Sequence, residues 1–208
     1  DMKRMVAYSS VGHMGYVLLA AAAATPVALL GAVFQMVSHG LISALLFLLV
    51  GIVYRKTGTR DLEVLRGLLN PEKGLPFTGS LMIVGVMASA GLPGMAGFIS
   101  EFLVFRGAIT TFPLATLLSM VGSGLTAVYF LLLVNRAFFG RLAITQPSGD
   151  PLVDNRLDVR LAPVAPRETI PAIALVAAVV GLGLLPSGLS HISEMATTAM
   201  ALGSGGVG

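Results

Sequence analysis

Three ionisable residues stand out because each lies inside a long apolar segment, where a charged side chain is costly. They are His13, His39 and Glu101. An ionisable group within a membrane-spanning segment is a functional candidate by default. Histidine gains and loses protons near neutral pH, and a carboxyl group is a common partner in proton transfer. If the chain lies in a membrane, these residue types indicate a path for protons.

Both histidines have polar neighbours at helical spacing, so each shares one helix face with other polar side chains. The first face would carry Ser9, His13 and Tyr16, and the second Gln35, His39 and Ser43. At 1.5 Å per residue, both histidines would lie near the middle of a bilayer. The spacing therefore predicts a lateral row of polar groups. For either histidine alone, a structural hydrogen bond to a neighbouring helix is an equally good explanation.

A break in an apolar run precedes the carboxyl group of Glu101. Four residues that favour irregular backbone mark it: Gly91, Pro93, Gly94 and Gly97. If a second half-helix begins there, its free N–H groups would favour the carboxylate anion, whereas apolar surroundings would favour the neutral acid. Opposed influences of this kind suit a group that exchanges protons. A simple kink remains the alternative, since Pro and Gly are common in membrane helices.

Hydroxyl groups recur at helical spacing within the next apolar run. They are Thr116, Ser119, Ser123 and Thr126, and we expect Ser123 and Thr126 to support the path by holding water or bonding to neighbouring helices. The alternative is an ordinary packing face between helices.

The composition places the chain in a membrane. Of its 208 residues, 55% are hydrophobic and only 11% are charged, whereas soluble domains carry about 25% charged residues. The chain has no cysteine, which excludes disulfides, thiolate metal sites and iron–sulfur ligation. We expect no bound metal. The basic residues lie in loops between apolar runs, a pattern of membrane topology that does not favour nucleic-acid binding.

Five apolar runs predict an all-α integral membrane protein with about five transmembrane helices, one of them discontinuous. Runs at about 5–25, 27–54, 75–109 and 113–139 fall within residues 1–141. A polar linker follows at 142–167, then a last helix at 168–189 and a tail at 190–208. We expect Thr169 to cap that helix, with Pro171 just inside it and no ionisable residue within its span.

Basic residues sort cleanly onto one side of such a bundle. With five crossings, twelve of the thirteen Lys and Arg residues fall on one side of the membrane, and only Arg106 falls on the other. By the positive-inside rule the crowded side is cytoplasmic or stromal. The chain opens with Asp1-Met2-Lys3-Arg4 and runs directly into an apolar segment, so we expect a C-terminal fragment of a longer membrane protein.

Three stretches resemble the antiporter-like membrane subunits of respiratory complex I, of the subunit 4 type. They are the run from Asp1 to Gly15, His39-Gly40-Leu41, and Gly91-Leu92-Pro93-Gly94-Met95-Ala96-Gly97-Phe98-Ile99-Ser100-Glu101-Phe102. The amino-acid sequence of residues 91–105 and 122–141 is most similar to that of chain 4 of the NAD(P)H-quinone oxidoreductases of cyanobacteria and chloroplasts. The resemblance covers about residues 1–141 and is weak beyond.

The resemblance implies a fourteen-helix fold with two inverted repeats, of which this chain would supply the last five helices. It places His13 and His39 on a central hydrated axis and Glu101 at its distal end. It implies a proton-translocating subunit of an NAD(P)H- or ferredoxin-quinone (plastoquinone) oxidoreductase in a thylakoid or bacterial inner membrane. Flavin, iron–sulfur clusters and quinone would belong to partner subunits, and this chain would contact other membrane subunits and lipid.

Three other readings stay open at this point. The first is a subunit of a multisubunit cation/proton antiporter, built on the same fold. The second is a membrane scaffold whose histidines are structural. The third, within the favoured reading, is a variant complex specialised for carbon dioxide uptake.

Overall fold

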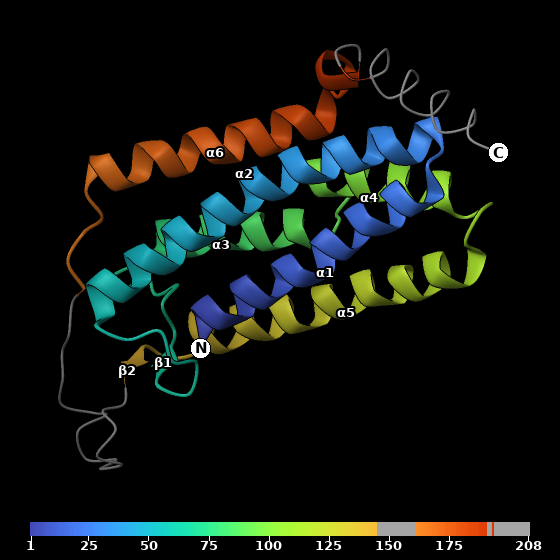
Figure 1. The fold of residues 1–208 in the computed structure, drawn as a ribbon. Coiled ribbons are helices and arrows are strands. Elements are labelled where there is room, and N and C mark those ends of the chain that lie inside the picture. Colours follow the sequence, from blue (N-terminus) through green and yellow to red (C-terminus); the bar gives the residue numbers. More distant parts are fainter. Residues whose placement is uncertain (145–160, 191–192, 194–208) are drawn as a thin grey trace.

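The computed structural model describes residues 1–144, 161–190 and 193. Within these residues the chain forms a bundle of six helices and a two-stranded sheet at one end (Figure 1). The elements are α1 (Met2–Ala23), α2 (Pro26–Thr57), β1 (Leu65–Arg66), α3 (Pro76–Ser89), α4 (Ala96–Ala108), α5 (Pro113–Phe138), β2 (Ala143–Ile144) and α6 (Pro166–Leu184). The expected all-α membrane architecture is confirmed. Most of the expected linker, and the tail apart from Ser190 and Ser193, lie outside the described residues.

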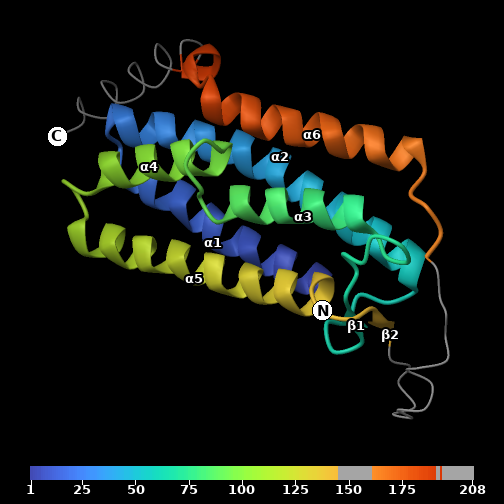
Figure 2. The ribbon, with the colours of Figure 1, turned by 180° about the vertical axis from the view of Figure 1, so that it is seen from behind.

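Four described helices are long and apolar enough to cross a membrane: α1, α2, α5 and α6. The third of the five expected crossings is shared by α3 and α4, of 14 and 13 residues. At 1.5 Å per residue each would span only about 20 Å, so neither reaches across a bilayer alone. The two lie roughly end to end in the view from behind (Figure 2).

Helix α2 is the centre of the bundle. It packs against α1, α3, α4 and α6, whereas α5 and α6 lie at opposite edges (Figures 1 and 2). The side chain of Thr25 caps its N-terminus by accepting a hydrogen bond from the amide of Ala28 (3.2 Å), and Pro26 follows in the first turn. The hydroxyl of Thr25 also donates to the carbonyl of Gly107 (2.9 Å), which ties this end of α2 to α4.

A small residue allows α2 and α4 to approach closely. A Cβ added at Gly31 would lie 2.5 Å from the backbone nitrogen of Val104. Close approach of helix backbones favours association in lipid, where the hydrophobic effect contributes little between helices. The crossing of α2 and α4 fixes the depth of α4, and therefore that of Glu101.

The beginning of α6 corrects one expectation. Its N-cap is Ala165 and its first residue Pro166, so Thr169 is not the cap and Pro171 lies inside the helix. The helix extends further because Pro166 suits a first turn and because the carboxylate of Glu168 accepts a hydrogen bond from the amide of Ala165 (3.2 Å). The helix therefore does carry an ionisable residue. Glu168 is buried and pairs with Arg55 at the end of α2 (2.8 Å).

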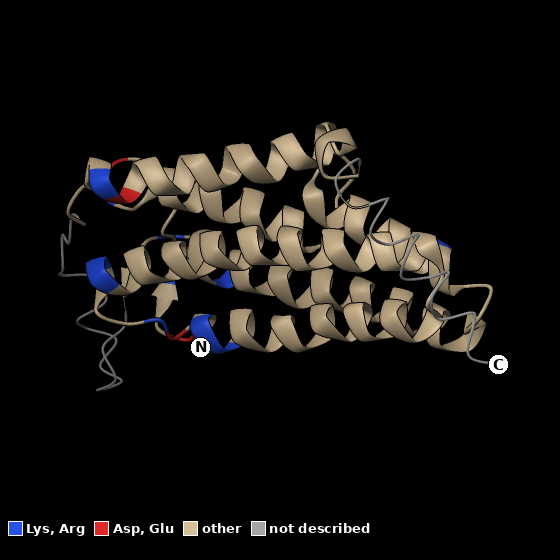
Figure 3. Ribbon diagram, turned by 45° about the horizontal axis from the view of Figure 1, so that its top comes forward, with Lys and Arg blue, Asp and Glu red and all other residues tan. Residues whose placement is uncertain are grey.

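Basic residues gather at one end of the bundle, the end that holds the N-terminus and the small sheet (Figure 3). Lys3 and Arg4 begin α1, Arg55 and Lys56 end α2, and Arg136 ends α5. Arg106 lies in the last turn of α4, on the opposite side. Arg156 and Arg160 lie outside the described residues. The distribution among the described residues supports the expected topology.

Candidate functional site

The interruption between α3 and α4 is built by the residues expected to break the helix. Gly91 and Gly94 adopt φ values of 70° and 91°, in the left-handed region that side chains with a Cβ avoid. Pro93 lies between them in the irregular segment, and α4 then begins at Ala96. At Gly97 an added Cβ would collide with the carbonyl oxygen of Ala88, so a small residue is needed where the half-helices overlap.

Glu101 does not lie in the first turn of α4, so one expectation about its surroundings is wrong. It is the sixth residue of the helix, beyond the free N–H groups of the N-terminus. Its carboxylate lies instead beside the break, where a Cβ added at Gly91 would be 2.8 Å from Oε2. Glu101 as a whole residue is only 6% exposed. The interruption therefore provides room for a buried carboxyl group.

The carboxyl group of Glu101 contacts two other helices. Ser123 of α5 donates a hydrogen bond to Oε2 (2.6 Å), and Oε1 lies 3.7 Å from Nδ1 of His13 on α1. Oε1 is buried and has no hydrogen-bond partner among the described residues. One oxygen is thus held in place, while the other faces the imidazole ring.

Two residues from different helices fix the ring of His13. Its Nδ1 lies 3.2 Å from the amide nitrogen of Gln35 on α2, and its Nε2 lies 3.2 Å from the hydroxyl of Ser89 at the end of α3. With the amide nitrogen of Gln35 placed toward Nδ1, the amide donates and Nδ1 accepts, which puts the proton of the neutral ring on Nε2 and leaves Oε1 of Gln35 buried without a partner among the described residues. This tautomer leaves Nδ1 without a proton for Glu101.

The second histidine continues the row. The rings of His39 and His13 have centroids 5.1 Å apart, and Nε2 of His39 lies 3.0 Å from the hydroxyl of Ser10. His13 is 4% exposed, whereas His39 is only half buried. The row therefore runs from a partly open histidine through a buried one to a buried carboxyl group.

Tyr16 and Ser9 share the buried face of α1 with His13, as the spacing predicted. The ring of Tyr16 meets the imidazole of His13 edge on, with centroids 5.7 Å apart, and it also packs on Phe105 of α4. Ser9 bonds to the backbone carbonyl of Val6 (2.7 Å). Tyr16 therefore helps to enclose the row, whereas the hydroxyl of Ser9 donates to a carbonyl of its own helix.

Two of the expected supporting hydroxyl groups bond to their own helices. Ser43 lies 3.3 Å from the carbonyl of Gly40, and Thr126 lies 3.1 Å from that of Gly122. Among the hydroxyl groups predicted to share one face of α5, that of Ser123 donates a hydrogen bond to Glu101.

Sequence reasoning missed Ser89 and Ser10, the partners of the two histidines. Ser89 is the last residue of α3, directly before the break, and a small polar residue at that point was the available signal. Ser10 directly follows Ser9 and gave no signal of its own. A third buried pair, Ser38 and Ser100 (3.0 Å), joins α2 to α4 beside the row.

The described residues contain no group of three or more His, Cys, Asp or Glu side chains that could hold a metal ion. The arrangement instead brings two imidazole rings and a carboxyl group next to one another between the helices.

A family model described as the NADH:quinone oxidoreductase/Mrp antiporter transmembrane region matches residues 1–126. Chain 4 1 of the NAD(P)H-quinone oxidoreductase of Synechococcus sp. (strain JA-3-3Ab) is 41% identical over 207 residues, which is 96% of this chain and 37% of that relative. Subunit M of the F(420)H(2) dehydrogenase of Methanosarcina mazei is 44% identical over 140 residues, covering 67% of this chain and 28% of the relative.

Two solved structures are similar along nearly the whole chain. Respiratory complex I from Thermus thermophilus with bound NADH matches with a TM-score of 0.81 and 26% identity, over 94% of this chain and 38% of that one. The Mrp complex from Dietzia sp. DQ12-45-1b matches with a TM-score of 0.75 and 25% identity, over 94% of this chain and 41% of that one. The chain thus spans a little over a third of the length of the cyanobacterial relatives it matches.

Proposed function

Because the chain belongs to the NADH:quinone oxidoreductase/Mrp antiporter transmembrane family, we propose that it forms part of a proton-translocating membrane subunit of an NAD(P)H-quinone oxidoreductase complex. The observation that carries the proposal is the row of His39, His13 and the buried carboxyl group of Glu101 beside the interruption between α3 and α4. The cyanobacterial and chloroplast relatives support a quinone-reducing complex of a thylakoid membrane as the setting.

In this proposal the proton step takes place between His13 and Glu101. When a proton reaches Nδ1 of His13, the amide nitrogen of Gln35 can no longer donate there and must turn away. Oε1 of Glu101, 3.7 Å distant and without a hydrogen-bond partner among the described residues, then accepts that proton from Nδ1. Gln35 returns to its hydrogen bond once Nδ1 is free again. The contact of Gln35 thus makes transfer to Glu101 depend on prior protonation of Nδ1.

The chain's own role in the redox reaction is indirect. We propose that flavin, iron–sulfur clusters and quinone are held by partner subunits, and that this chain binds no redox cofactor. Redox chemistry elsewhere would change the charge next to the row, and protons would move in response.

The proposal is tested with Glu101→Gln in the intact, purified complex reconstituted into vesicles. The amide cannot carry a proton, so we expect fewer protons pumped for each quinone reduced, while the quinone reduction rate in uncoupled vesicles changes much less. Glu72→Gln is the matched control, because Glu72 is exposed at the end of the bundle. An unchanged ratio of protons to electrons in Glu101→Gln contradicts the proposal.

A subunit of a multisubunit cation/proton antiporter is a second candidate, favoured by the likeness to the Mrp complex. Such a complex would move protons against Na⁺ without reducing a quinone. Co-purification of this chain with flavin- and iron–sulfur-containing subunits favours the oxidoreductase, and Na⁺-driven proton movement in their absence favours the antiporter.

The double variant His13→Gln, His39→Gln distinguishes a proton path from a purely structural scaffold. If the row carries protons, the variant assembles but pumps fewer protons for each electron. If the histidines are only structural, pumping is the same as in the unchanged complex.

A further inference from the structure

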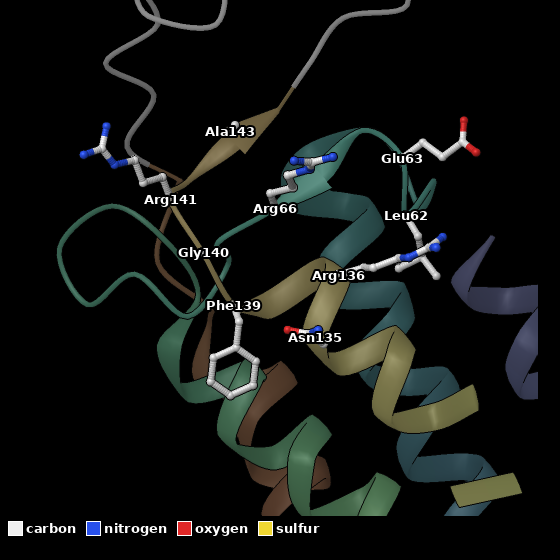
Figure 4. A pocket seen from close by; sticks show the side chains of 9 residues that line it. All are labelled: Leu62, Glu63, Arg66, Asn135, Arg136, Phe139, Gly140, Arg141 and Ala143. Carbon is white, nitrogen blue, oxygen red and sulfur yellow. The ribbon is translucent and has the colours of Figure 1, made fainter. Parts of the chain in front are cut away.

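A cavity of about 900 Å³ opens at the basic end of the bundle, away from the row of histidines. It lies where the end of α5 meets β1, β2 and the loop before them (Figure 4). Three arginines line it, Arg66, Arg136 and Arg141, together with a single carboxylate, Glu63. The lining therefore carries an excess of positive charge.

Hydrogen bonds hold the backbone around this cavity, so the positions from which the arginine side chains start are fixed. Arg66 of β1 pairs with Ala143 of β2. The amides of Gly67 and Leu68 donate to the carbonyls of Phe139 and Ala137 (both 3.1 Å), which are among the otherwise free carbonyls at the end of α5. Because these carbonyls are already bonded, the negative end of α5 repels an anion less strongly.

Two of the arginines that line the cavity extend toward the same side of it. In Figure 4 the side chains of Arg66 and Arg136 both extend toward the side of Leu62 and Glu63, whereas Arg141 extends in the opposite direction. Both Arg66 and Arg136 are exposed, and neither has an ion pair within the described part of the chain. A pair of guanidinium groups without partners is suited to a phosphate, whose oxygens match their fork of N–H donors.

An apolar stripe on α5 leads to this pair. Val121, Leu125, Val128 and Leu132 recur at helical spacing and are 63%, 62%, 55% and 49% exposed. Arg136 follows Leu132 by one turn, and Phe139, 52% exposed, lines the cavity beside it. A ligand that occupies both features has a phosphate at one end and hydrocarbon along the helix.

We propose that the cavity binds the phosphate headgroup of an anionic phospholipid, whose acyl chains lie along the exposed stripe of α5. The location agrees with this occupant, because anionic headgroups concentrate in the leaflet on the basic side of a membrane protein. Asn135, which also lines the cavity, can donate to a headgroup hydroxyl or ester oxygen. The site uses none of the residues of the proton path, so it stands or falls independently of the proposed function.

The test uses the intact complex, stripped of lipid in detergent and then incubated with vesicles of phosphatidylcholine alone or with added phosphatidylglycerol. Bound lipid is extracted and counted by mass spectrometry. In the variant Arg66→Gln, Arg136→Gln we expect the affinity for phosphatidylglycerol to fall about tenfold or more, since two basic contacts are lost. Both single variants are measured as well, with smaller losses expected, so the test holds even if the double variant assembles poorly.

Two controls accompany these variants. Arg167→Gln removes the same charge at the same end of the bundle but outside the cavity, and it should retain phosphatidylglycerol like the unchanged complex. Arg66→Lys with Arg136→Lys keeps the charge without the bidentate fork and should restore part of the binding. Equal retention of phosphatidylglycerol in all variants overturns the proposal. Arginine-dependent binding of inorganic phosphate with no retention of phosphatidylglycerol overturns it too, since the site would then take a soluble anion.

Discussion

Ser123 on α5 donates a hydrogen bond of 2.6 Å to Oε2 of Glu101 on α4, although the two residues lie 22 positions apart on different helices. The bond leaves only Oε1 facing His13. A carboxyl group held by one oxygen presents the other in a fixed direction, which suits repeated proton transfer with one partner.

Replacing Ser123 by Ala should slow proton transfer without preventing assembly. A hydrogen bond to a charged group contributes about 1.5–3 kcal/mol, so loss of the bond at the step that forms the Glu101 anion corresponds to roughly a tenfold slower step or more. Proton pumping by reconstituted complex measures the effect. Ser119→Ala removes a hydroxyl from the same helix that has no hydrogen bond within the described residues, and it should leave pumping unchanged. Equal effects of the two variants would contradict the role of Ser123.

Replacing Gly91 by Ala should disturb Glu101 more than it disturbs the fold. The left-handed backbone at this position costs about 1–2 kcal/mol for a residue with a Cβ. The new methyl group would also press on Oε2 of Glu101, 2.8 Å away. We expect a lower ratio of protons to electrons together with a small loss of thermal stability. The control is Gly124→Ala on α5, where an added Cβ meets nothing within 4 Å.

Replacing Gln35 by Leu should change the tautomer of His13. The variant removes the only donor that reaches Nδ1 in the described structure, so protonation at Nδ1 becomes competitive with protonation at Nε2. Solid-state ¹⁵N spectra of labelled histidine report the two nitrogens separately. Ser38→Ala on the same helix breaks the buried bond to Ser100 and does not touch His13. A spectrum that Gln35→Leu leaves unaltered would show that Gln35 does not set the tautomer.

Replacing Gly31 by Ala should separate α2 from α4. Because the added Cβ would meet backbone atoms of Val104, which cannot rotate away, the helices must move. Overpacking of this kind typically costs about 1–3 kcal/mol. We expect lower thermal stability of the assembled complex, measured by loss of intact complex on heating in detergent. Gly40→Ala on α2, where an added Cβ meets nothing within 4 Å, should be neutral.

The sequence by itself determined the membrane class, the interrupted helix and the polar faces. These depend on local properties: the length of an apolar run, the backbone freedom of Gly91 and Gly94, and the helical spacing of residues such as Ser9 and His13. Because these properties are local, they could not predict where α6 begins. Its start depends on the bond between Glu168 and Ala165 and on the pairing of Glu168 with Arg55.

Only the tertiary structure decided which polar groups meet. His13 contacts Ser89, 76 positions away, and Glu101 faces His13 and Ser123 at the break, not the N-terminus of its own helix. Ser43 and Thr126 have helical spacing as regular as that of Ser123, yet their hydroxyls bond to their own backbone. Spacing along one helix fixes which face a residue occupies, but the packing of α1, α2, α4 and α5 sets which faces oppose each other. That packing depends on contacts between distant residues, such as Gly31 with Val104.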